Sequence, residues 1–123
     1  MPTPPTIVIT DQRLDRAELA RLVREHFRDM VKFVVDVSRR VVAVGGELHA
    51  VGESLLLEDG SAQDDLWGAN YYPGRGPAEC VQFTALINIR PARGNPGMEI
   101  ADPAIRAVVR ELASTVLGTG EPL

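Results

Sequence analysis

The stretch "VKFVVDVSRRVVAVGG", residues 31–46, constrains the fold more than any other part of the sequence. It contains two runs rich in valine, Val31–Val37 and Val41–Val44, with the polar break Ser38-Arg39-Arg40 between them. Valine is branched at its β-carbon and favours extended backbone. Two such runs joined by a few polar residues are typical of a β-hairpin, so we expect an antiparallel pair of strands here.

The first valine-rich run has two different faces if it is a strand, because successive side chains point to opposite sides of a sheet. One face carries only apolar side chains, from Val31, Phe33, Val35 and Val37. The other face carries Lys32, Val34 and Asp36. An antiparallel sheet of this kind is expected to carry its helices on one face.

Apolar residues at helical spacing mark two main helices, over about residues 15–30 and 103–117. The segment near 50–58 fits either a short strand or a short helix. We favour the helix there, although Gly52 weakens it because glycine is a poor helix former.

Three further segments are expected to be extended, at residues 7–9, 66–72 and 81–90. The last of these has the most regular alternation of apolar and polar residues in the chain. Together with the hairpin and the helices, these strands predict an α+β fold. We expect a single two-layer domain with a mostly antiparallel sheet of about four or five strands.

The length and composition fit one soluble globular domain over residues 1–123. Hydrophobic residues make up 45% of the chain and charged residues 24%, which is the balance of a protein with a real core. Residues 1–5 are expected to form a flexible lead-in, because three of these five residues are proline.

The charge and the cysteine content narrow the partners and the compartment. The net charge is −4, and the arginines of the first expected helix alternate with acidic residues, so we expect no nucleic-acid partner. No apolar run approaches the roughly 20 residues that span a bilayer, so we expect no membrane insertion. Cys80 is the only cysteine, which excludes an internal disulfide and fits the reducing cytoplasm.

Three of the six aromatic residues fall within "DDLWGANYYPGRG", residues 64–76. If residues 66–72 form a strand, alternation places Trp67 and Tyr71 on one face, where they pack inward. Asn70 and Tyr72 then lie on the other face. Aromatic side chains with polar tips suit both ligand binding and packing in a small core.

The outward pair, Asn70 and Tyr72, could face the polar side of the strand expected over residues 81–90, which carries Asn88 and Arg90. Asparagine and arginine together can hold a carboxylate or a phosphate. The sequence therefore predicts a ligand-binding site of these four residues. The alternative is a network of cross-strand hydrogen bonds with only a structural role.

A second constellation is a carboxylate and an imidazole directly after a Gly-Gly pair. Glu47 and His49 would point the same way from an extended segment, and Asp36 on the preceding hairpin could join them. Such a group can bind a divalent metal or act as acid and base. The alternative is that His49 makes a loop hydrogen bond and Glu47 is solvated.

The stretches "VAVGGELHA", "LLLEDGSAQDDLWGANYYPG", "LINIRPARGN" and "MEIADP" resemble a small family of prokaryotic proteins with a domain of unknown function. The resemblance covers most of the chain from Met30 onward. It implies a compact intracellular prokaryotic protein. It carries no assigned catalytic residues, so it adds nothing to the two candidate sites.

The preferred interpretation is a small cytoplasmic module that binds a small molecule or a protein partner without catalysis. The alternative is a metal-assisted hydrolase that uses Glu47, His49 and Asp36 with a divalent metal as cofactor. A third hypothesis is self-association into a homodimer through the aromatic run, since an incompletely covered sheet often pairs with a second copy.

Overall fold

A five-stranded antiparallel sheet forms the centre of the protein in the computed structural model, which describes residues 6–123. The strands stand in the order β1-β3-β2-β4-β5, and every neighbouring pair is antiparallel. Their bounds are Ile7–Thr10, Val31–Asp36, Val41–Gly45, Leu66–Tyr71 and Val81–Gln82 for β1 to β5. The expected α+β class is confirmed. The lead-in expected at residues 1–5 lies outside the described residues.

The expected hairpin is confirmed as β2 and β3, which lie at the centre of the sheet. β2 pairs with β3 on one side and with β4 on the other. Asp36 ends β2 and closes the turn, because its Oδ1 accepts hydrogen bonds from the backbone N–H groups of Ser38 (2.9 Å) and Arg39 (2.8 Å). A side chain thus supplies the acceptor that these turn amides need.

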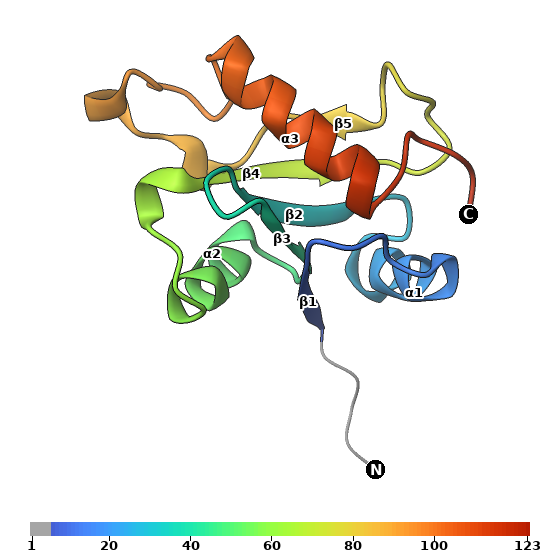
Figure 1. The fold of residues 1–123 in the computed structure, drawn as a ribbon. Coiled ribbons are helices and arrows are strands. Elements are labelled where there is room, and N and C mark those ends of the chain that lie inside the picture. The colour runs from blue at the N-terminus through green and yellow to red at the C-terminus, as the bar shows by residue number, and fades with distance from the viewer. Residues whose placement is uncertain (1–5) are drawn as a thin grey trace.

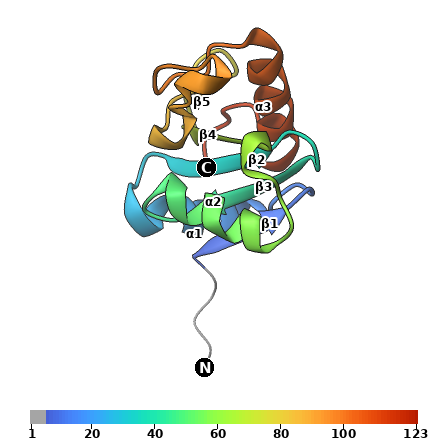
Figure 2. The ribbon, with the colours of Figure 1, turned by 90° about the vertical axis from the view of Figure 1, so that its left-hand side faces the viewer.

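Helices cover both faces of the sheet, so the molecule has three layers (Figures 1 and 2). α1 (Arg16–His26) and α3 (Pro103–Val116) lie on one face, and α2 (His49–Glu58) lies on the other. The expectation of a two-layer domain with its helices on one face is wrong in this respect. Val34 is as fully buried as Val35, on the opposite face of β2. β2 thus buries an apolar side chain on each face, and both faces have to be covered by other elements.

The helix favoured near residues 50–58 is confirmed as α2, and Gly52 has a packing role in it. A Cβ atom at Gly52 would lie 3.2 Å from a methyl carbon of Val34 and 3.6 Å from the Cβ of Ala43. The missing side chain therefore lets α2 lie close against β2 and β3. The same glycine that weakens helix propensity fixes the position of this helix.

The two main helices are confirmed, with the first shorter than expected. α1 ends at His26 because Arg28 adopts a left-handed backbone conformation, with φ of 70°. α3 begins after Asp102, whose carboxylate accepts a hydrogen bond of 2.8 Å from the backbone N–H of Ala104. Within residues 6–123, no helix is long and apolar enough to cross a membrane.

The strand expected over residues 81–90 is wrong beyond its first two residues. After β5 the chain makes one isolated bridge, between Thr84 and Glu99, and then a 3₁₀ turn at Leu86–Asn88. Alternating apolar and polar residues are compatible with such an irregular path, because a turn can also bury every second side chain.

Asn88 shows why the backbone does not continue as a strand. Its Oδ1 accepts a hydrogen bond of 2.8 Å from the N–H of Gly68, and its Nδ2 donates one of 2.9 Å to the carbonyl of Gly68. The side-chain amide thus makes the two hydrogen bonds that the backbone of a longer β5 would make to β4.

Candidate ligand-binding site

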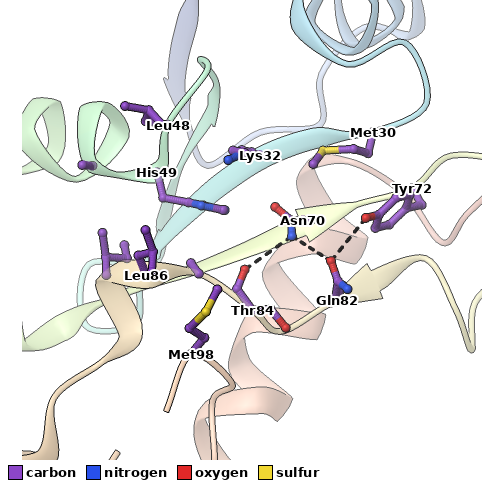
Figure 3. Close-up of a pocket in the computed structure, with 13 residues that line it drawn as sticks. Met30, Lys32, Leu48, His49, Asn70, Tyr72, Gln82, Thr84, Leu86 and Met98 are labelled. Atoms are coloured by element: carbon purple, nitrogen blue, oxygen red, sulfur yellow. Dashed lines mark hydrogen bonds between the residues drawn. The ribbon is translucent and has the colours of Figure 1, made fainter. Parts of the chain in front are cut away.

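The α2 face of the sheet contains a cavity of about 380 Å³. It lies between the first turn of α2, strands β2, β4 and β5, and the segment 84–87 (Figure 3). α2 packs on Val34 and Ala43 and so covers only part of this face. The cavity occupies the part that the helix leaves uncovered.

Three polar side chains from neighbouring strands form the floor of the cavity: Lys32 of β2, Asn70 of β4 and Gln82 of β5. The strand register places Lys32 opposite Asn70 and Asn70 opposite Gln82. Directly opposed residues of antiparallel strands have Cβ atoms about 4.5–5.5 Å apart. The three side chains therefore form one continuous row across the sheet.

Asn70 is the buried centre of this row, with only 7% of its surface exposed. Its Nδ2 donates hydrogen bonds to Oε1 of Gln82 (2.9 Å) and to the backbone carbonyl of Thr84 (3.4 Å). The Thr84 carbonyl can only accept, which fixes the orientation of the Asn70 amide. Oδ1 of Asn70 has no hydrogen-bond partner within residues 6–123. The cavity floor thus contains a buried acceptor without a hydrogen-bond partner, next to the imidazole of His49.

His49 is the first residue of α2 and is buried against the strands (Figure 3). Its Nε2 lies 2.8 Å from the carbonyl oxygen of Ala69, so Nε2 carries the proton and donates it. Burial lowers the pKa of His49 to about 4. The charge of Lys32 lowers this pKa too, while the Ala69 carbonyl and the Asn70 side chain act in the opposite direction. The imidazole is therefore neutral at pH 7.

Lys32 is the only residue with a charge at neutral pH among the described residues that line the cavity. The side chain is half-buried, and its Nζ lies 5.2 Å from the centre of the Phe27 ring. This distance is within the range of a cation–π contact. The cavity therefore combines one cation, one free acceptor and a neutral imidazole.

The walls and the mouth of the cavity are apolar. Ala85 and Ile87 line the side formed by the segment after β5. Leu48, Leu86 and Met98 also line the cavity and are 56%, 69% and 41% exposed, so they form its rim. Small-molecule sites commonly have this composition, with apolar walls and a few polar groups that fix the orientation of the ligand.

The structure brings together two of the four residues of the predicted ligand site. Asn70 and Tyr72 both line the cavity, and the Tyr72 hydroxyl donates a hydrogen bond of 3.2 Å to the same Gln82 oxygen that Asn70 contacts. The Tyr72 ring also packs against the guanidinium of Arg75, at 3.8 Å from the ring centre. The inward positions expected for Trp67 and Tyr71 are confirmed, because both lie in the core on the opposite face.

Asn88 and Arg90 are not part of the cavity, and their roles in the fold explain why. Asn88 is fully buried and bonded to β4 as described above. Arg90 donates a hydrogen bond of 2.6 Å to the carbonyl of Leu66, and its guanidinium lies 4.8 Å from the centre of the Trp67 ring and 3.6 Å from Glu53. Both side chains hold the irregular segment after β5 against the sheet.

The three residues of the predicted metal site lie apart. Asp36 is buried in the hairpin turn, Glu47 is exposed before α2, and His49 is in the cavity. Throughout residues 6–123, no group of three or more His, Cys, Asp or Glu side chains is arranged to hold a metal ion.

Sequence reasoning missed Lys32 and Gln82, and it assigned His49 to a different kind of site. Lys32 carries a signal of its own, because it is the only lysine in the sequence and stands within a valine-rich strand. Gln82 carries no such signal. Its position beside Asn70 depends on which strands pair and in which register.

Comparison with known proteins gives a family and no further relative. Residues 8–116 match the family described as "Protein of unknown function (DUF5674)". No curated protein and no solved structure matches the chain. The family resemblance expected from the sequence therefore agrees with the match, and the cavity has to be interpreted from its own chemistry.

Proposed function

The chain belongs to the family of unknown function DUF5674, and we propose that it is a binding module that holds a small organic molecule in the cavity on the α2 face. The observation that carries this proposal is the unsatisfied Oδ1 of Asn70. A buried polar atom without a partner costs about 1–3 kcal/mol. A ligand that donates a hydrogen bond to Asn70 would remove that cost.

The size and lining of the cavity support a ligand of this kind. Its volume of about 380 Å³ lies within the range of roughly 300–1,000 Å³ that ligand pockets usually have. The proposed role is binding without catalysis. Cys80 lies outside the cavity, and burial raises the pKa of its thiol, which makes it a poor nucleophile.

The proposal is tested by blocking the cavity from its exposed edge. Ala50 lines the cavity and is itself exposed on α2, so Ala50→Phe should fill the mouth without changing the core. The probe is anilinonaphthalene sulfonate, a dye with an aromatic body, a sulfonate and an N–H group. We expect the wild-type protein to bind it with a fluorescence increase, and Ala50→Phe to reduce its affinity at least about tenfold.

Ala107→Phe is the matched control, because Ala107 is an exposed alanine on α3, on the other side of the sheet. This variant should bind the dye like the wild type. Equal dye binding by the wild type and Ala50→Phe would show that the dye occupies another surface, and no dye binding by the folded wild type would contradict the proposal directly.

The remaining parts of the proposal concern the setting in which the module works. We propose the prokaryotic cytoplasm, supported by the single cysteine and by the resemblance of the sequence motifs. The homodimer stays a prediction. The aromatic run was its expected surface, but Trp67 and Tyr71 are buried, so of its three aromatic side chains only Tyr72 remains accessible, and the exposed apolar rim of Leu48, Leu86 and Met98 would have to contribute.

A further inference from the structure

The positive charge in the cavity comes from one residue at a defined place. Lys32 faces Asn70 directly across the β2–β4 pair, so the two side chains belong to the same row, and Oδ1 of Asn70 has no hydrogen-bond partner within residues 6–123. His49 adds no charge at neutral pH, because its imidazole is held neutral by burial. An anionic group of the ligand therefore has one place to bind, at the Lys32 end of the floor.

A single ammonium fits one kind of anion better than another. A phosphate monoester carries a charge of about −1.5 to −2 at neutral pH and is usually held by several donors or by arginine. A carboxylate carries one charge and matches one lysine. The described lining contains no arginine. The charge balance of the cavity thus favours a carboxylate.

The free acceptor adds a second requirement. Oδ1 of Asn70 cannot exchange places with Nδ2, because Nδ2 is committed to Gln82 and to the Thr84 carbonyl. The ligand must therefore supply an N–H or O–H group at Asn70, next to the anion at Lys32. Apolar walls and a rim of leucine and methionine require that the rest of the ligand is apolar.

We propose that the ligand is an apolar organic acid that carries an N–H or O–H donor close to its carboxylate. The carboxylate binds Lys32, the donor binds Oδ1 of Asn70, and the apolar tail extends toward Leu48, Leu86 and Met98. This inference rests on the proposed function, because it names the class of ligand for the same cavity. N-acyl amino acids and hydroxy acids with a hydrocarbon tail have this chemistry.

Three probes with the same tail separate the two head-group requirements. N-octanoylglycine has both the carboxylate and the N–H group. N-methyl-N-octanoylglycine lacks only the donor, and the methyl ester of N-octanoylglycine lacks only the charge. In isothermal titration at neutral pH, we expect the parent compound to bind at least about tenfold more tightly than either analogue.

Variants then assign the charge requirement to one side chain. Lys32→Met keeps the apolar stem and removes the charge, so it should bind the parent and the ester equally. Lys32→Arg should keep the preference for the parent. Arg24→Met removes one positive charge from an exposed site on α1 and should bind all three probes like the wild type.

The only lysine also gives a direct readout. Reductive methylation with ¹³C-formaldehyde labels Lys32 and the N-terminal amine and keeps their charges. The Lys32 signal in the NMR spectrum should shift on addition of N-octanoylglycine and should stay in place on addition of its ester. The N-terminal signal serves as the internal reference.

The outcomes separate the ligand class from the cavity itself. Equal affinity for the three probes, or an unchanged preference in Lys32→Met, would overturn the ligand class while the cavity still binds. Binding of anilinonaphthalene sulfonate without binding of any octanoyl probe would also overturn the ligand class. If neither the dye nor any probe binds, both the ligand class and the proposed function are wrong.

Discussion

The two faces of the sheet are formed by the same strands but differ in how completely they are packed. On the face covered by α1 and α3, Phe33 and Tyr71 belong to a large continuous core of buried apolar side chains. On the face covered by α2, a smaller apolar cluster around Val34 gives way to the cavity with Lys32 and Asn70. One face stabilises the fold by close packing, whereas the other leaves space above a row of polar groups.

Gly68 lies at the edge of the cavity, where the surrounding residues come into close contact. It lies on the α2 face of β4, and a Cβ atom there would lie 2.6 Å from the Cβ of Ala85 and 3.1 Å from the ring of His49. Two residues further along β4, Asn70 is the next side chain on this face. The walls therefore meet at Gly68 and separate again at Asn70. The close contact of Ala85 and His49 at Gly68 thus marks one end of the cavity.

The packed face depends on large buried side chains such as Phe33. Phe33→Ala removes a buried aromatic side chain and leaves a void, which costs about 3–5 kcal/mol in the free energy of unfolding. Urea-induced unfolding measures this change. Its matched control is Lys32→Met, one residue earlier on the opposite face, which should change the free energy of unfolding by less than about 0.5 kcal/mol. Similar losses in both variants would contradict the contrast between the faces.

Beside the cavity, the side chain of Asn88 makes the hydrogen bonds to β4 that a longer β5 would make with its backbone. Asn88→Ala leaves the N–H and the carbonyl of Gly68 without their partner. Two unsatisfied buried groups cost about 2–6 kcal/mol in the free energy of unfolding. Asn88→Asp keeps the acceptor for the Gly68 N–H but turns a buried carboxylate oxygen toward the carbonyls of Gly68 and Met98, so its loss should be at least as large as that of Asn88→Ala. A loss below about 0.5 kcal/mol for Asn88→Ala would mean that water satisfies Gly68 equally well.

These two variants also separate what the sequence predicts from what it does not. The alternation around Phe33 is a local signal, and it correctly predicts the hairpin and its apolar face. The strand at residues 66–71 is likewise predicted by its own residues. The bonds of Asn88 join segments that are far apart in the chain. The same alternating pattern after Val81 fits a strand or an irregular segment, and only the contact with Gly68 decides between them.

The cavity residues also divide into those that local sequence predicts and those that depend on strand pairing. Asn70 and Tyr72 were found because their own strand was predicted and its alternation gives their direction. Lys32 and Gln82 belong to other strands, and they join Asn70 only through the register of two strand pairs. The residue types around His49 favour a metal site, and the burial that makes this histidine neutral depends on contacts with other segments, such as the carbonyl of Ala69.

His49 makes the stability of the cavity face depend on pH. His49 has a pKa of about 4 in the folded protein and an ordinary value of about 6.5 when unfolded. Between these two values the unfolded chain binds a proton at His49 that the folded protein does not bind. The free energy of unfolding therefore falls as the pH falls through this window, by about 2–3 kcal/mol from this residue. Unfolding in urea at several pH values between 7 and 4 measures the slope.

His49→Gln isolates this contribution, because glutamine can still donate a hydrogen bond to the Ala69 carbonyl but does not titrate. The carboxylates of the protein affect the wild type and the variant alike, so the difference between the two slopes belongs to His49. We expect the variant to lose less stability than the wild type below pH 6.5. Equal slopes would mean that the imidazole is protonated in the folded protein as easily as in the unfolded chain. Water would then reach His49. The α2 face would differ from the face covered by α1 and α3 in its packing and not in its polarity at His49.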